Sequence, residues 1–330
     1  MIDFRYHLVS IIAVFLALAI GLAVGSTALS GKAIGFLTSQ EHRAVASNIA
    51  LEKRNQALSN QVAADQAFAQ AASQRLAGDL LAQEKVVVVV APGADNVVTD
   101  GVTTILRQAG AIVTGEVNLQ QSFLTTNGAN ETTLTQLADN LAAKTGLTVP
   151  TQSQSPVAGQ QAVAELLAAS LLDSPTGVTT TGTTLSSKSS ADILTGLEQN
   201  GFVTVDGTPA PASIAVLVVP GGPPPQTGNQ VLVGLATQLK LASSATVMAG
   251  GSESVGSGSV VSDENNSANP VSTVDNADTE SGQIMVAQAL RYLLQGKTPA
   301  AFGIDSGTAP SPAPTPSAIA SSASTGKGHP

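Results

Sequence analysis

The chain has 330 residues, a formal net charge of -9 at pH 7 and no cysteine. The missing thiols exclude disulfides, thiolate metal sites and cysteine nucleophiles, and the acidic balance makes nucleic acid an unsuitable partner. Aromatic residues make up only 3% of the sequence and tryptophan is absent, so we expect a core of small and β-branched side chains.

An uncharged apolar run extends from Leu8 to Leu29. A helix rises about 1.5 Å per residue, so a run of this length crosses a hydrocarbon core of roughly 30 Å. We predict a membrane anchor over residues 1–31, with an uncleaved signal-anchor helix over residues 8–29. The alternative is a cleaved signal peptide, because small residues stand at positions 24–26 and 28–30. The run exceeds the apolar segment of a usual signal peptide, about 7–15 residues, and this favours retention.

Residues 32–85 have the pattern of a helical stalk. No proline occurs between Lys32 and Lys85, and the Ala, Gln, Glu and Arg residues there are good helix formers. A narrow face repeats at spacings of three and four, which is typical of a coiled coil, although Asp65 would place a charge in it. We predict a parallel homodimer, or a higher homo-oligomer, whose seam contains Leu51, Asn55, Leu58 and Val62. The alternative is a single amphipathic helix that lies on its own domain.

Residues 86–305 have the pattern of an extracytoplasmic α/β domain. Continuous aliphatic runs such as Val86–Val90 are typical of strands buried on both faces of a parallel sheet. These runs alternate along the chain with segments whose apolar residues have helical spacing. This order predicts a doubly wound αβα fold of the Rossmann or flavodoxin-like type. The expected strands are 86–90, 111–117, 212–219 and 245–249, and the expected helices are 98–109, 131–144, 160–172, 190–199, 231–241 and 284–295. The Pro-, Ser- and Ala-rich residues 306–330 are expected to form a disordered tail.

The histidines predict that this domain is not an enzyme of the usual hydrolytic kinds. They are His7, His42 and His329, which fall before the apolar run, in the stalk and in the tail. Without histidine or cysteine, the α/β domain cannot assemble a Ser-His-Asp or Cys-His triad or a usual zinc site. We therefore expect no catalytic residue and no tightly bound cofactor.

Three glycine-containing turns follow expected strands, at residues 91–93, 220–222 and 249–251. The carboxyl ends of parallel strands meet at one edge of a sheet, where ligands of doubly wound folds usually bind. None of the turns has a dinucleotide or P-loop pattern, and glycine after a strand is normally turn chemistry. A structural role is therefore favoured over a ligand-binding crevice.

Carboxylates cluster at Asp275, Asp278 and Glu280. Hard cations prefer such oxygen ligands, so these residues are candidates for a metal site. The alternative is the start of a helix, with Asp278 or Thr279 as its cap and Glu280 beside its positive end. The spacing lacks an EF-hand pattern, which favours the helix start.

The opening segment Met1–Gly21, MIDFRYHLVSIIAVFLALAIG, resembles the start of the actinobacterial copper transporter family typified by mycobacterial MctB. The resemblance continues through the stalk to Val271–Asp278 and Ala289–Arg291. It implies a pore-forming protein of the outer membrane that lowers intracellular copper. Copper would then be a transported ion rather than a bound cofactor.

The residues themselves favour a different arrangement. A transmembrane barrel needs alternating strands and two aromatic girdles, whereas this chain has continuous aliphatic runs and few aromatics. A single helix following Arg5 fits the inner membrane with the bulk of the chain outside the cytoplasm, although Lys32 and Arg43 oppose that orientation.

Two functions remain as hypotheses. One is copper efflux or channel activity, in which Ser10, Ser26 and Thr27 are the hydroxyls that an oligomeric helical pore could use. The other is a dimeric scaffold whose non-catalytic α/β domain recruits or regulates cell-wall enzymes as envelope partners. A periplasmic enzyme or binder of small ligands has the least support.

Overall fold

The computed structural model describes residues 4–149, 157–173, 185–207, 209–222 and 226–305, with side chains for all of these except residues 4, 5, 26–40, 226 and 227. The chain divides into two compact units, Met1–Asp65 and Gln66–Pro330. The first unit consists, where described, of one continuous helix. The predicted tail, residues 306–330, lies outside the described residues.

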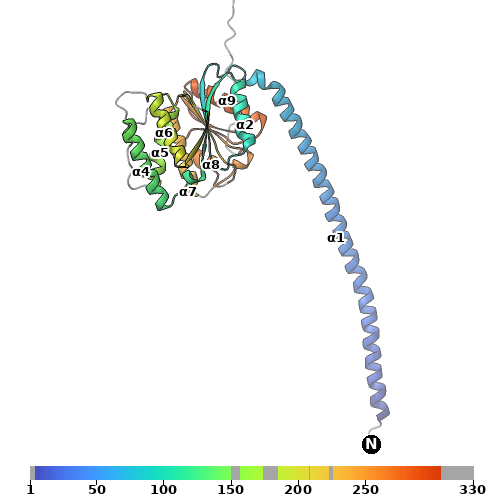
Figure 1. Cartoon of the computed structure of the whole chain (residues 1–330). Helices are drawn as coiled ribbons and strands as arrows, with labels where there is room; N and C mark the ends of the chain where they lie inside the picture. Colours follow the sequence, from blue (N-terminus) through green and yellow to red (C-terminus); the bar gives the residue numbers. More distant parts are fainter. Residues whose placement is uncertain (1–3, 150–156, 174–184, 208, 223–225, 306–330) are drawn as a thin grey trace, which may run out of the picture. The chain divides into compact units, whose positions relative to one another are not determined.

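The long helix α1 extends from Phe4 to Ala77 (Figure 1). It therefore ends at Ala77, whereas the sequence predicted that the stalk would reach Lys85. Beyond Ala77 the chain turns, with Asp79 at a φ of 59°, and buries Leu81 completely. The Leu81 N–H donates to the Ala109 carbonyl at 2.9 Å. Burial of Leu81 in the domain thus outweighs the local helix propensity of the residues around it.

The second unit contains a seven-stranded sheet in the order β3-β2-β1-β4-β5-β6-β7. All neighbouring strands are parallel except β2 and β3, which are antiparallel. The strands are β1 Lys85–Val90, β2 Ile112–Leu119, β3 Val203–Asp206, β4 Ile214–Val218, β5 Ala245–Ala249, β6 Ser272–Val274 and β7 Ala301–Phe302. The direction of strand addition reverses between β1 and β4, as in a doubly wound fold, and the predicted fold class is confirmed.

Helices cover both faces of this sheet, with α2 and α9 on one side and α4, α5 and α6 on the other (Figure 1). The helices of this unit are α2 Asn96–Gln108, α3 Gln121–Leu124, α4 Gly128–Thr145, α5 Ala158–Leu171, α6 Ser187–Gln199, α7 Gln226–Ala242, α8 Val260–Asn265 and α9 Glu280–Leu294, with a short 3-10 helix at Ser252–Ser254.

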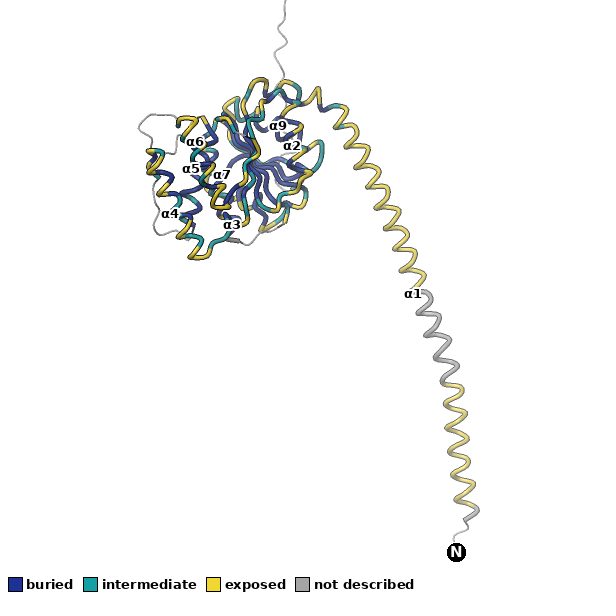
Figure 2. Tube along the Cα trace, in the orientation of Figure 1, coloured by how far each residue is buried: buried dark blue, intermediate teal, exposed yellow. Residues whose placement is uncertain are grey.

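Alternate residues of β1 explain why its sequence is aliphatic throughout. Val87 and Val89 belong to the core under α4–α7, whereas Val86, Val88 and Val90 belong to the core under α2 and α9. Successive side chains of a strand point to opposite faces, so a strand covered on both sides must be apolar at every position. Figure 2 shows the buried strands between the two helical layers.

The sequence did not predict β3, β6 or β7. The β6 strand, Ser272–Val274, is fully buried although two of its three residues carry hydroxyls. Those hydroxyls have partners, because the Ser272 Oγ accepts from the Ala300 N–H at 3.1 Å and the Thr273 Oγ1 donates to the Asn265 Oδ1 at 2.6 Å. Hydrogen bonds formed only in the folded domain therefore allow a polar segment to act as a buried strand.

Candidate functional site

The first candidate is the apolar helix near the N-terminus. Within α1, Tyr6–Gly25 has a mean hydropathy of 2.8 and is long and apolar enough to cross a membrane. All of its side chains are exposed, including the large Phe15 and Leu22. An exposed apolar surface of this size requires a lipid or protein environment. The predicted apolar helix is confirmed; its retention after export stays a prediction.

The second candidate is the stalk face of α1. Leu51, Leu58 and Val62 are 55%, 51% and 52% exposed, and Asn55 between them is exposed as well. The spacing of three and four residues places all four on one side of the helix. The structure therefore contains the predicted seam as an exposed face of the chain, and its pairing with another copy stays a prediction.

The last turns of α1 belong to the second unit and pack against it. Ala69 lies at the edge of the core formed with α2 and α9, and Ala77 is fully buried in that core. The Gln288 amide of α9 donates to the Leu76 carbonyl at 3.4 Å. For these turns, the alternative of a helix lying on its own domain describes the structure.

The three glycine turns meet at the carboxyl edge of the sheet, as the sequence predicted. A Cβ at Gly93 would stand 3.7 Å from the Pro220 Cβ, and one at Gly221 would stand 2.7 Å from the Glu253 Cβ. A Cβ at Gly251 would stand 3.4 Å from the Cβ of Asp278. Close packing accounts for glycine at Gly221, where a Cβ would clash with Glu253, and a φ of 82° favours glycine at Gly93. A Cβ at Gly251 would make only ordinary van der Waals contact.

The acidic cluster is used for hydrogen bonds inside the domain. The buried Asp275 carboxylate accepts from the backbone N–H groups of Ile304 and Asp305 at 2.7 and 3.0 Å. The Asp278 Oδ1 accepts from the N–H and the hydroxyl of Ser252 at 2.7 and 2.8 Å.

The residues after Asp278 fit the helix interpretation of this segment. Thr279 caps α9 by accepting from the Gly282 N–H, and Glu280 lies in the first turn. Among the described residues, no group of three or more His, Cys, Asp or Glu side chains is placed to hold a metal ion. The geometry supports the helix start over the cation site.

Two buried carboxyl groups were not singled out from the sequence. Burial raises the pKa of Glu165 on α5 to about 7, and its Oε1 has no hydrogen-bond partner in the described part of the chain. Burial also raises the pKa of Glu264 on α8, which the hydrogen bond from the Val271 N–H opposes. The sequence could have indicated that Glu165 is buried, because it is the one charged residue in the apolar run of α5.

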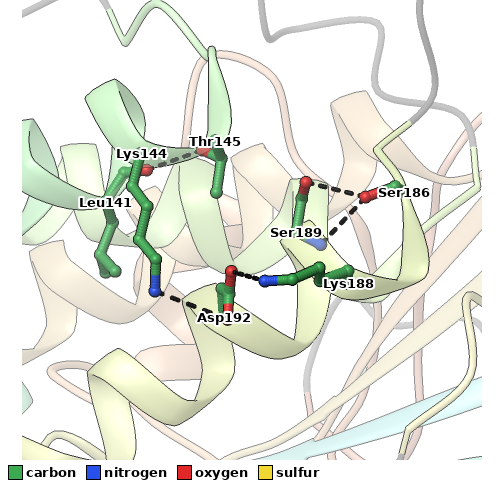
Figure 3. Close-up of polar contacts among 7 residues, drawn as sticks. All are labelled: Leu141, Lys144, Thr145, Ser186, Lys188, Ser189 and Asp192. Atoms are coloured by element: carbon green, nitrogen blue, oxygen red, sulfur yellow. Dashed lines mark hydrogen bonds and ion pairs between the residues drawn. The ribbon is translucent and has the colours of Figure 1, made fainter.

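A polar cluster joins α4 to α6 on the surface (Figure 3). Asp192 of α6 lies 3.0 Å from the Lys188 Nζ on its own helix and 3.5 Å from the Lys144 Nζ of α4. The hydrogen bond from Lys188 is the largest of the effects that lower the pKa of Asp192. Exposed ion pairs of this kind contribute little to stability, so we assign the cluster no functional role.

A cavity of about 370 Å³ lies beside α6 and the end of β3. Its lining includes Leu194, Val205 and Pro209, together with the Ser187 hydroxyl and the Glu198 carboxylate. The Glu198 Oε1 accepts from the Val205 N–H at 3.3 Å. None of the described residues that line the cavity is histidine, cysteine or methionine, the side chains that copper prefers.

Comparison with known proteins shows similarity along nearly the whole chain. Residues 1–314 match the family described as "Copper transport outer membrane protein, MctB". The "Copper transporter MctB" of Mycobacterium tuberculosis (strain ATCC 25618 / H37Rv) is 29% identical over 317 residues, covering 93% of this chain and 98% of the relative. The protein of the same description from Mycobacterium leprae (strain TN) is 30% identical over 318 residues, with the same coverage. The similarity therefore includes the apolar helix, the stalk and the α/β domain.

Proposed function

The chain belongs to the MctB family of copper transport outer membrane proteins, and from this premise we propose that it acts in copper efflux and lowers the copper content of the cell. The observation that carries the proposal is the match over residues 1–314, which includes every element of the described architecture. The family is one of transport proteins, and the domain's lack of histidine and cysteine is consistent with a role that needs no tightly held copper.

Efflux by this chain requires more than one copy or a partner channel. One membrane-spanning helix encloses no path for an ion, so a pore must be lined by several helices. Of the hydroxyls predicted for such a lining, Ser10 lies in the described apolar helix and is exposed, whereas the side chains of Ser26 and Thr27 lie outside the described set.

Oligomerisation in this proposal occurs through the stalk. Leu51, Leu58 and Val62 form an exposed apolar face, and two copies in parallel would bury these side chains against one another. Asn55, at the same seam, would fix the register and favour two strands. The chain therefore acts as a parallel homodimer held by its stalk.

The same helix also bears on which membrane holds the chain. The family description names the outer membrane, while one apolar helix after Arg5 fits the inner membrane with the α/β domain outside the cytoplasm. We propose the second arrangement for this chain, with an envelope protein completing the path across the outer layer.

A second candidate function is a dimeric scaffold that presents the α/β domain to cell-wall enzymes. The observation that favours it is the domain itself, whose sheet is covered on both faces and whose Asp275 and Asp278 are held by internal hydrogen bonds. Such a domain offers its outer surface to partners rather than an interior path to an ion.

The deciding experiment is the copper content of cells that lack the gene, with and without the intact chain restored, under moderate copper load. Efflux predicts that copper rises on deletion and returns to the parental level on restoration. Unchanged copper, together with altered cell separation or wall composition, would reject efflux and support the scaffold.

A further inference from the structure

One face of α1 changes its surroundings along its length. Val62 and Ala69 are seven residues apart, close to two turns of a helix, and therefore lie on the same face. Leu51, Leu58 and Val62 are exposed, whereas Ala69 and Ala72 are partly buried and Ser73 is 6% exposed. The stripe that the sequence presents as one continuous seam therefore has two different environments.

The side chains differ in size between the two stretches. The exposed stretch has leucine and valine, which are large enough to act as knobs between paired helices. The second stretch has alanine and serine at its partly or fully buried positions, Ala69, Ala72, Ser73 and Ala77, while Leu76 at its margin is 45% exposed. Small residues let a helix approach its neighbour closely, and here the neighbour is the chain's own core with α2 and α9.

Asp65 stands between the two stretches. It is exposed, and it occupies a seam position in the repeat that contains Leu51, Leu58 and Val62. In a parallel in-register pair, the two Asp65 carboxylates would face each other, and like charges there would oppose further pairing. A charge that is unfavourable inside a seam is tolerated at its end.

We propose that Val62 is the last residue of the intermolecular seam, that Asp65 marks its boundary, and that from Ala69 onward the same helical face belongs to the chain's own α/β domain. This inference rests on the dimer of the proposed function. It assigns the exposed face of the stalk to a second copy of this chain and gives that interface a defined end.

The absence of native cysteine allows a direct test in the full-length membrane-bound protein. Single variants Leu51→Cys, Leu58→Cys, Asn60→Cys and Ser73→Cys are oxidised and analysed for disulfide-linked dimers. A disulfide requires Cβ atoms about 3.5–4.5 Å apart, so we expect dimers at positions 51 and 58. We expect no disulfide-linked dimer at position 60, which lies on the opposite side of the helix. We also expect none at position 73, where the change from serine to cysteine is nearly isosteric.

A second measurement separates the boundary from the dimer. Ser73→Cys should react slowly with a soluble thiol reagent, and equally slowly when Leu51, Leu58 and Val62 are replaced by serine, because the domain of the same chain covers it. Cross-linking at 51, 58 and 73 together, or a large gain in reactivity at 73 in the serine background, would overturn the boundary while leaving the dimer intact. No cross-linking at any position would overturn the dimer and the boundary with it.

Discussion

At Asp275, a residue that the sequence offered as a metal ligand, the carboxylate holds the chain after β7 through two backbone N–H groups. Asp275→Asn would replace one accepting oxygen of this buried side chain with an NH2 group, which would face one of these backbone donors without accepting its hydrogen bond. We expect it to lower the free energy of unfolding by about 1–3 kcal/mol, measured by urea denaturation of the detergent-solubilised protein. Glu280→Gln in the first turn of α9 is the matched control and should change stability by only a few tenths of a kcal/mol. Normal stability with lost copper efflux in the Asp275 variant would instead support the cation site.

At Glu165, burial raises the pKa to about 7 from an ordinary value of 4.5. The folded protein therefore holds a proton that the unfolded chain releases, and stability falls as pH rises through this interval. We expect the thermal midpoint to decrease between about pH 4.5 and pH 7, and this decrease to be smaller in Glu165→Gln. Glu52→Gln, at an exposed position of α1, should keep the parental pH dependence. Identical profiles for the parent and Glu165→Gln would show that Glu165 is ionised in the folded state.

At the scale of elements, the stalk gives the clearest prediction. Replacing Leu51, Leu58 and Val62 with serine should convert the dimer to monomer, because the seam loses its apolar side chains. Sedimentation of the detergent-solubilised protein measures this change. The control variant replaces three residues on the opposite side of α1 with serine, namely Ala46, Lys53 and Asn60. It should leave the dimer intact. A seam variant that stays dimeric would show that another surface joins the copies.

For the molecule as a whole, the described residues contain one helix that is long and apolar enough to attach the chain to a membrane, Tyr6–Gly25. Arginine at the centre of a membrane helix costs about 2.5–3.5 kcal/mol on insertion scales, so Leu16→Arg should shift the chain from the membrane to the soluble fraction. It should also abolish restoration of copper levels, whereas Leu16→Ile should preserve both. Full membrane retention of Leu16→Arg would mean that the α/β domain binds the membrane or a membrane protein. The intact mass of the mature chain separately tests whether residues 1–31 are retained.

The parts of the fold that were predicted depend on local pattern. The apolar helix, the stalk, the aliphatic strands β1, β4 and β5 and the larger helices follow from hydrophobic periodicity, which a short window of sequence contains. The convergence of the three glycine turns also followed, because parallel strands place their carboxyl ends together. The assignment of Leu51 and Leu58 to a dimer seam also comes from spacing alone, and pairing through them stays a prediction.

The remaining features depend on contacts between residues far apart in the chain. Tertiary structure decided that α1 ends at Ala77, because Leu81 is buried beside Ala109. It decided that Ser272–Val274 is a strand, because Asn265 and Ala300 satisfy its hydroxyls. It also decided that Asp275 binds the backbone after β7. By itself, the sequence determined the apolar anchor, the helical stalk and the parallel sheet, since periodicity encodes them locally. Only the folded structure determined the roles of polar groups such as Ser272 and Asp275, because their partners come from distant segments.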